Sequence, residues 1–496
     1  MYLSHPDLEN FEPFLRDLLD TAFNTGGKYL KDNGITLDDI KLFLKDKSQN
    51  KEFIKQCHKG YNWAQEKIGN KIISLQELKL SLVERKSTAS QSSISEIGTQ
   101  ILIIENRTLV LRRIIDSIGY TLLNRKQWIM RRFILHSLST SNINCNEIKA
   151  NLREASFRNN TDRQVFNLAC DLSNIFHVGD LLKIDFRKHP PKWEIIELKK
   201  GHINNELRKI INDHPDSAKV VTPSAKLTLD DKTSKQLNRM RRQIARMRNI
   251  ENIYSTDQGV DTTSGCKLFL NKEEIPLDHY YEVLEKAVSN AHNKGSSLHQ
   301  IDDCLFILAS KEHSAFQIKH ILFHLTNPFS QCHFESRDID NSNIRNEIKA
   351  VSKDWFIADF IKGSIHTMGC EPTFTLPINH EIILDLLFER VKVGIGIAVE
   401  PFIELLNKNG VNARLGTRKE TGDHLHTRGN IETLLYKKRI IICNMLNGYE
   451  FVLGTGILSR MLFDLVRPGI IPSVFIEAHR QYDEQGTFNQ GGAGTL

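Results

Sequence analysis

The sequence predicts an α+β protein of several domains. At 496 residues the chain is too long for one ordinary hydrophobic core, so about two to four domains are expected. Apolar residues at helical spacing dominate its first part, whereas strand-like apolar runs alternate with helical stretches in its last part. We predict a mostly helical region at 1–140, an α/β core at 141–257, an α/β recognition or regulatory domain at 258–484 and a flexible tail at 485–496.

The first region contains several helical patterns. Residues 11–20 and 53–63 mix apolar and charged side chains at helical spacing, and the serine-rich stretch 87–93 is typical of a loop. The apolar and basic stretch 101–138 is interpreted as a pair of core helices whose arginines face solvent or pair with acids. The alternative is a helical arm that clamps nucleic acid or senses a partner. Two further helices are expected within 146–171, separated at 159–161.

Two neighbouring strands are predicted next, at 177–185 and 193–201. The prolines at 190 and 191 mark a turn between them, because proline lacks an amide hydrogen and fixes φ. Side chains alternate along a strand, so Glu197 and Lys199 share one face while Leu198 points away. The two strands therefore bring Glu197 and Lys199 close to Asp180. Asp185 is the alternative acid if the first strand carries a bulge.

The Glu-x-Lys tripeptide alone is weak support for a functional site at Glu197 and Lys199, because the same tripeptide recurs in segments of helical or linker character. Those other matches begin at Glu77, Glu84, Glu147 and Glu347. Only the match at Glu197 ends a β-branched run, Ile195-Ile196, and follows a strand that opens with Gly-Asp. The alternative interpretation is an edge strand with solvated charges.

A basic helix is predicted at 234–248. Apolar residues recur there every three or four positions, at Leu237, Met240, Ile244 and Met247, and indicate one buried face. The other face carries arginines whose guanidinium groups can bind phosphate oxygens in pairs. We expect these arginines to contact a nucleic-acid backbone, the alternative being a solvated basic face. They are Arg239, Arg242 and Arg246.

Two carboxylates and a lysine on adjacent strands, followed by such a helix, resemble the PD-(D/E)xK nuclease superfamily over residues 146–250, roughly a fifth of the chain. The resemblance implies a restriction-endonuclease-like core. In that core Asp180, Glu197 and the backbone carbonyl of Leu198 would hold Mg²⁺, for which Mn²⁺ can substitute. Lys199 would orient or activate the attacking water, and Gln236 would match a glutamine that many members carry near the start of the following helix.

Two positions bear on finer points of the resemblance. Met240 stands where some branches carry a tyrosine. Glu154 is the candidate for the extra glutamate that some members present to a second metal from a helix, and we interpret it as a surface charge.

The function that the resemblance implies is an endonuclease. DNA is the expected substrate, contacted through its phosphate backbone, because DNA cleavage dominates the superfamily. A single-chain nuclease with large attachments resembles a prokaryotic restriction or anti-phage effector, and the Shedu type of immune nuclease is one comparison. A homodimer is expected if two active sites make a double-strand break. The alternative is a ligand-sensing or nucleic-acid-binding scaffold protein in which the nuclease fold is inactive, or is an output regulated by an unknown ligand or phage factor.

The composition indicates the net charge of the protein and the cellular compartment in which we expect it. A net charge of +6 is small for this length, so any affinity for nucleic acid must come from local clusters. The eight cysteines lack paired C-x-x-C spacing and are interpreted as buried apolar residues in a reducing compartment. With neither a signal peptide nor a run long enough to span a bilayer, we expect a cytoplasmic protein without membrane contact.

Two motifs of the last domain are interpreted conservatively. Gly394-x-Gly396 lies inside an apolar run, so it is not expected to be a dinucleotide-binding loop. His424 and His426 lie in the polar run 418–430, which we interpret as an exposed loop because a zinc site needs more ligands than two. The alternative is a mobile loop at 416–428 that contacts a phosphate-bearing ligand.

Overall fold

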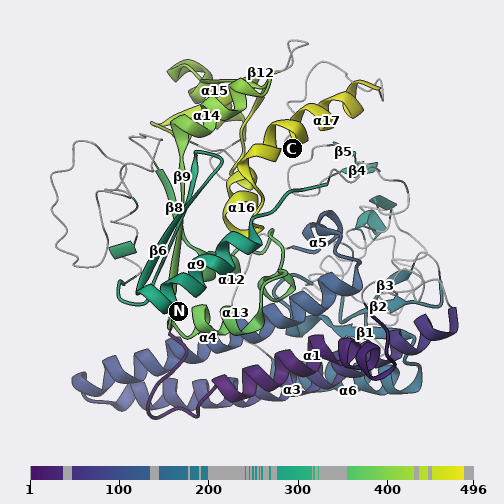
Figure 1. Cartoon of the computed structure of the whole chain (residues 1–496). Helices are drawn as coiled ribbons and strands as arrows, with labels where there is room; N and C mark the ends of the chain where they lie inside the picture. Colours follow the sequence, from purple (N-terminus) through teal and green to yellow (C-terminus); the bar gives the residue numbers. More distant parts are fainter. Residues whose placement is uncertain are drawn as a thin grey trace, which may run out of the picture. The chain divides into compact units, whose positions relative to one another are not determined.

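The structure is a computed structural model, and its fold is α+β, as expected (Figure 1). It describes residues 2–36, 47–134, 144–176, 179–188, 191–198, 276–314, 355–428, 435–444 and 450–484, with 317, 318, 322 and short pieces between 241 and 269. Two compact units are present. The helical unit comprises residues 14–104 and 111–270, and the C-terminal unit comprises 1–13, 105–110 and 271–496.

Long helices dominate the helical unit. They are α1 (Glu12–Asp32), α3 (Lys47–Thr88), α4 (Gln91–Leu122), α5 (Gln127–Phe133) and α6 (Cys145–Thr161). Two residues separate α3 from α4, so the loop expected at 87–93 is shorter than predicted. Glycines let α1 and α3 approach closely, because a Cβ at Gly26 would meet Cys57 Sγ at 2.5 Å and one at Gly60 would meet Thr21 O at 2.6 Å.

The sheet of the helical unit has three antiparallel strands in the order β1-β2-β3: β1 (Val165–Ala169), β2 (Leu181–Asp185) and β3 (Lys192–Ile196). The two adjacent strands are present but shorter than predicted, because β2 begins only after Asp180 and β3 ends before Glu197. The second helix predicted within 146–171 is wrong, because α6 ends at Thr161 and β1 follows. All five residues of β1 are buried, and so short an apolar run shows no period that separates strand from helix.

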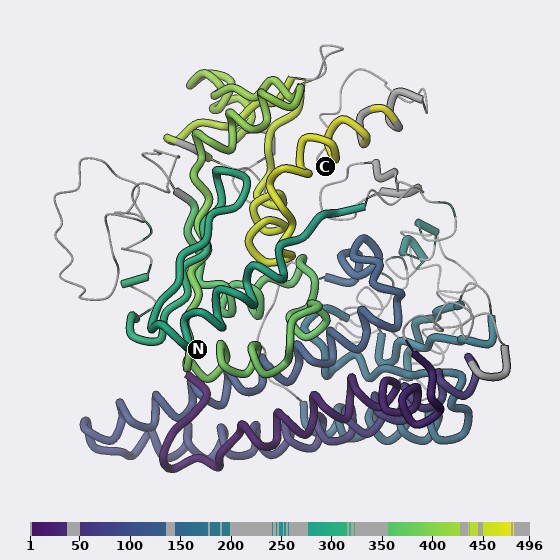
Figure 2. Tube along the Cα trace, in the orientation of Figure 1, coloured from purple at the N-terminus to yellow at the C-terminus, as the bar shows by residue number. Residues whose placement is uncertain are grey.

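Helix α6 packs against α3 and β1 (Figure 2). Side chains of α3 and α6 complete the hydrogen bonding of β1. Gln65 of α3 accepts from Ala169 N at 2.8 Å and donates to Asn167 O. Asn159 of α6 accepts from Asn167 N at 2.7 Å and also donates to Asn167 O. These buried amides bond to the outer edge of β1, where a fourth strand would pair, so no further strand can pair with β1 at these residues.

The C-terminal unit contains the α/β pattern expected for the last domain. Its larger sheet is antiparallel in the order β6-β7-β9-β8, formed by β6 (Ser296–Ile301), β7 (Leu305–Ser310), β8 (Trp355–Asp359) and β9 (Lys392–Ala398). A smaller sheet has the order β10-β12-β11, with β13 paired to β12. Its strands are β10 (Asn412–Leu415), β11 (Leu435–Tyr436), β12 (Arg439–Asn444) and β13 (Glu450–Val452).

Helices connect these strands. They are α9 (Tyr281–Lys294), α12 (Phe360–His366), α13 (His380–Leu387), α14 (Val399–Lys408), α15 (Arg418–Arg428), α16 (Thr455–Phe463) and α17 (Ile471–Glu484). Gly394 lies inside β9, where a Cβ would meet Ile318 Cγ2 at 2.5 Å, so this glycine serves packing. No helix in the described part of the chain is both long and apolar enough to cross a membrane.

The loop predicted at 418–430 is wrong, because residues 418–428 form α15. Positions two apart on a helix point about 200° away from each other. His424 and His426 therefore cannot face one side together, as they would on an extended segment.

The cysteines largely agree with expectation. Cys170, Cys304, Cys370 and Cys443 are buried free thiols, whereas Cys57 and Cys145 are half-buried. Cys266 and Cys332 lie outside the described residues.

Candidate functional site

The candidate site lies where β2 begins and β3 ends. Asp180 directly precedes β2 and Glu197 directly follows β3. The amide of Asp180 donates to Ile196 O and its carbonyl accepts from Cys170 N, both at 2.9 Å. In a regular strand both groups of one residue point to the same neighbour, so the chain is kinked at Asp180 as at a β-bulge. Asp180 is thus held by the strands on both sides of it.

Gly179 makes this kink possible. Its φ is +80°, a conformation that side-chain-bearing residues rarely adopt. A Cβ at this position would also meet Ile195 Cγ2 at 2.3 Å. The Gly-Asp pair noted in the sequence is therefore a structural requirement for placing Asp180.

The side chain of Asp180 points toward the end of β3. Its Oδ2 atom accepts a hydrogen bond from Leu198 N at 2.5 Å. The structure therefore brings together Asp180, Glu197 and the backbone of Leu198, three of the positions named from the sequence. The remaining named positions lie outside the described residues: Lys199, Gln236, Arg239, Arg242 and Arg246. In the stretch predicted as the basic helix, Arg241, Ala245 and residues 248–250 are helical.

A third carboxylate, Asp171, joins this site and was not named from the sequence. It lies in the single turn η1 (Cys170–Leu172) that follows β1, and its Oδ2 accepts from Asn151 Nδ2 at 2.6 Å. Burial raises the pKa of Asp171, and the nearby charges of Asp180 and Glu147 raise it further, against the Asn151 hydrogen bond and Arg112. Residues 162–171 were expected to be helical, so Asp171 was not predicted to lie beside the strands.

The buried thiol of Cys170 shows how closely these groups gather. Burial raises its pKa well above the usual range, and the charges of Asp171, Asp180 and Glu197 act in the same direction. The thiol therefore stays protonated in the ion-free protein. The charges of Asp171, Asp180 and Glu197 all act on this one group.

The other acids considered in the sequence have different roles. Asp185 lies at the far end of β2, where Arg187 donates to both of its oxygens, at 2.8 and 2.7 Å. These hydrogen bonds lower the pKa of Asp185 to about 2. Glu154 accepts from Arg158 Nε at 2.8 Å, one turn along α6. Both acids are thus held in local ion pairs, as expected for Glu154.

The other Glu-x-Lys matches lie on helices where the structure describes them. Glu77 and Glu84 belong to α3 and Glu147 to α6, while Glu347 lies outside the described residues. Strand context therefore distinguishes Glu197 from these three.

A buried ion pair on α4 fixes the segment that leads from β1 toward Asp180. Asp116 accepts from Ser173 Oγ and from Asn174 N, and Arg113 Nη1 lies 3.8 Å from its Oδ2 atom. Both charged side chains are fully buried. Burial raises the pKa of Asp116, whereas Arg113 and these hydrogen bonds lower it. The pair anchors residues 173–175 to the helices.

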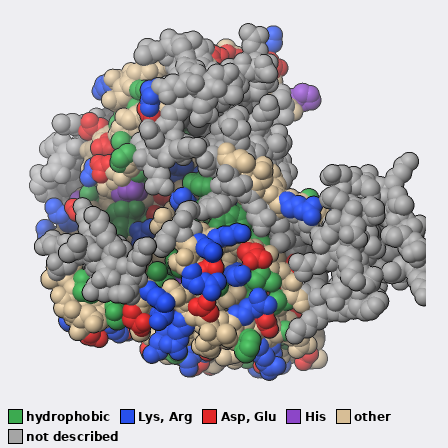
Figure 3. All heavy atoms as spheres, turned by 90° about the vertical axis from the view of Figure 1, so that its right-hand side faces the viewer, with side chains coloured by type: hydrophobic (Ala, Val, Ile, Leu, Met, Phe, Trp, Pro, Cys, Tyr) green, Lys and Arg blue, Asp and Glu red, His purple; other side chains and the backbone are tan. Residues whose placement is uncertain are grey.

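Charges of both signs mix on the described surface of the helical unit, where Figure 3 shows Lys and Arg side chains beside Asp and Glu. Arg187 lies 2.9 Å from Asp162, and Lys183 lies 3.1 Å from Glu194. Such pairs neutralise one another locally. Any affinity for nucleic acid would therefore have to come from particular cations, as the small net charge also indicates.

Comparisons of the chain with protein-family models, with curated proteins and with solved structures gave no match.

Proposed function

We propose that the chain is a Mg²⁺-dependent endonuclease that hydrolyses phosphodiester bonds in DNA, of the kind used in prokaryotic defence. The observation that carries the proposal is the gathering of Asp171, Asp180 and Glu197 at one end of the β1-β2-β3 sheet. A helix before the sheet, α6, and acids at the start of β2 and the end of β3 agree with the order that the resemblance implies.

The residues present offer oxygen ligands to a divalent cation, although the carboxylate oxygens of Asp171, Asp180 and Glu197 do not all lie within 4.8 Å of one another, so a bound ion would have to draw them together. Neither Asp171 nor Asp180 has an ion pair with a cationic side chain in the described part of the chain. Close carboxylates without such partners repel one another, and a bound cation relieves that repulsion. Carboxylate and carbonyl oxygens suit Mg²⁺ or Mn²⁺ better than zinc.

Asp180, Glu197 and the carbonyl of Leu198 would hold the ion. When bound, it would polarise the scissile phosphate and help to stabilise the charge that develops in the transition state. The Leu198 amide fixes the orientation of the Asp180 carboxylate before any substrate arrives. Lys199, the next residue, would orient the attacking water and place positive charge near the phosphate oxygens.

Plasmid, linear DNA and RNA incubated with the full-length protein in Mg²⁺ or Mn²⁺ test the proposal. We expect the wild type to cut DNA and Glu197→Gln to cut it roughly 10³-fold more slowly. Glu194→Gln is the matched control, because Glu194 lies three residues earlier on β3, is exposed and pairs with Lys183. Lys199→Ala should also be slow.

Two outcomes would count against the proposal. If no substrate is cut in either ion, or if Glu197→Gln cuts as fast as Glu194→Gln, these carboxylates do not catalyse hydrolysis. Cutting that begins only after a ligand or phage extract is added would favour the alternative in which the nuclease is the output of a sensor.

A further inference from the structure

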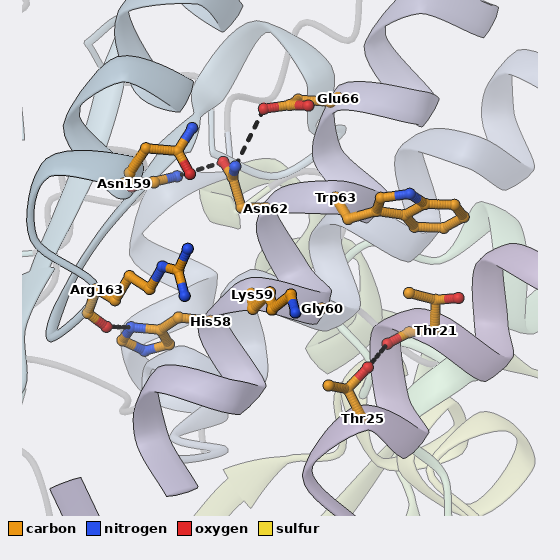
Figure 4. A pocket seen from close by; sticks show the side chains of 11 residues that line it. Thr21, Thr25, His58, Lys59, Gly60, Asn62, Trp63, Glu66, Asn159 and Arg163 are labelled. Carbon is orange, nitrogen blue, oxygen red and sulfur yellow. Dashed lines mark hydrogen bonds between the residues drawn. The ribbon is translucent and has the colours of Figure 1, made fainter. Parts of the chain in front are cut away.

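A pocket with apolar and charged side chains in its walls lies in the helical unit, away from the carboxylates. Its volume is about 410 Å³, and its walls come from α1, α3, the end of α6 and the turn before β1 (Figure 4). The pocket residues near 159–163 precede β1, whereas Asp171 follows it. A five-residue strand separates the two places by roughly 16 Å. The volume lies within the range of about 300–1,000 Å³ that is typical of small-molecule sites.

Two cations, Lys59 and Arg163, line this pocket, and the charge of Arg163 also acts on Glu52. Neither Lys59 nor Arg163 has an ion pair with a carboxylate among the residues described. Other cations of this unit do have partners, at 2.6 Å for Lys28 with Asp20 and 3.1 Å for Lys55 with Glu52. Two cations on one pocket favour an anionic ligand, and the Arg163 fork suits phosphate oxygens.

His58 fixes the backbone beside these cations and adds no charge. Its Nδ1 atom lies 2.7 Å from Arg163 O, so Nδ1 carries the proton and donates it. Burial lowers the pKa of His58 to about 4. The ring is therefore neutral at physiological pH, and the positive charge of the pocket comes from Lys59 and Arg163.

The remaining walls offer different chemistry. Figure 4 shows Trp63, Glu66 and Arg163 arranged around Lys59. Oε1 of Glu66 accepts from Asn62 Nδ2 at 3.1 Å and from Ser156 Oγ at 2.5 Å, which fixes the carboxylate. A carboxylate held in this way can accept a sugar hydroxyl or a base amino group. The indole of Trp63 is an aromatic surface with Lys67 Nζ over the ring, 5.5 Å from its centroid, so a base would stack on the opposite face.

We propose that this pocket binds a nucleoside phosphate. The phosphate would lie against Lys59 and Arg163, the sugar or base would hydrogen-bond to Glu66, and the base would pack on Trp63. The site is distinct from the carboxylate site, so the proposal does not depend on nuclease activity.

Calorimetric titration of the full-length protein tests this assignment. The probes are adenosine and guanosine 5′-monophosphate, adenosine, inorganic phosphate and a short single-stranded oligonucleotide. We expect a monophosphate to bind at least about ten-fold more tightly than adenosine or inorganic phosphate, since only the monophosphate fills both ends of the pocket. Arg163→Gln and Lys59→Gln should each weaken its binding by about ten-fold.

Lys28→Gln is the matched control, because it removes a positive charge from α1 outside the pocket and should leave binding unchanged. Circular dichroism of each variant checks that the helices are intact. Glu197→Gln should bind the nucleotide like the wild type, which separates this proposal from the nuclease. Three results would overturn it: no monophosphate binds, phosphate or the oligonucleotide binds more tightly than either monophosphate, or Arg163→Gln and Lys28→Gln bind alike.

Discussion

Two antiparallel sheets of the molecule, one in each unit, differ in the partners of the carboxylates that lie near them. Around the β6-β7-β9-β8 sheet of the C-terminal unit, acids serve local structure. Asp359 caps α12 by accepting from Lys362 N at 3.0 Å. Asp385 lies 2.5 Å from Arg390 and 2.7 Å from His292.

At the β1-β2-β3 sheet of the helical unit the acids are instead gathered together. Burial and the charge of Asp180 raise the pKa of Asp171, and neither acid has a described ion-pair partner. Apolar strands of similar composition thus support two different arrangements. The partners of the carboxylates, and not the strands themselves, indicate which sheet carries a site.

The largest difference in the free energy of unfolding is expected between a variant that breaks a buried ion pair and one that breaks an exposed ion pair. Asp116→Ala removes the partner of the fully buried Arg113 and should lower the free energy of unfolding by about 3–5 kcal/mol. Asp385→Ala in the C-terminal unit breaks a partly exposed network and should cost about 1 kcal/mol or less. Urea unfolding of both variants measures the contrast, and equal losses would show that the Asp116 pair does not anchor the sheet.

The next largest difference in stability is expected between alanine substitutions at two glycines with positive φ. Gly179→Ala should cost about 2–4 kcal/mol, because the left-handed conformation is strained and the new methyl meets Ile195 at 2.3 Å. Gly410→Ala has a similar φ of +85° but its nearest neighbour is at 3.8 Å, so about 1 kcal/mol is expected.

Thermal unfolding compares these glycine variants, and a DNA cleavage assay should show loss only for Gly179→Ala, because it displaces Asp180. A Gly179→Ala protein as stable and active as Gly410→Ala would show that the kink at Asp180 is unnecessary.

Acid should weaken the helical unit through His58. Its pKa is about 4 in the folded protein against a reference of 6.5, so the unfolded chain binds the proton more tightly. This contribution is present above pH 6.5 and is lost as the pH falls toward 4, by on the order of 2–3 kcal/mol. Urea unfolding at pH 7.5 and 4.5 should show a smaller pH dependence for His58→Gln, and an unchanged dependence would exclude this role.

The sequence was sufficient for those parts of the site that depend on local pattern. The proline turn and the apolar runs on both sides of it predict two paired strands whose ends bring Asp180 near Glu197, and apolar runs mark β7, β9 and β12. The sequence was insufficient where tertiary contacts determine the secondary structure. The five buried residues of β1 have no period of their own, so the sequence misplaced Asp171 on a helix.

The pocket lined by Lys59 and Arg163 could not be predicted from the sequence. Lys59 and Arg163 are about a hundred residues apart and are brought together only by the packing of α3 against α6. His58 gives no local signal either, since its low pKa arises from burial in the folded unit.

The most direct test of the central claim, that the acids at the end of the β1-β2-β3 sheet hold a divalent cation, is calorimetric titration of the full-length protein with Mn²⁺. We predict that the wild type and Glu194→Gln bind Mn²⁺ alike, and that Asp180→Asn binds it at least about ten-fold more weakly. Equal Mn²⁺ binding by Asp180→Asn and the wild type, or no binding by either, would contradict the claim.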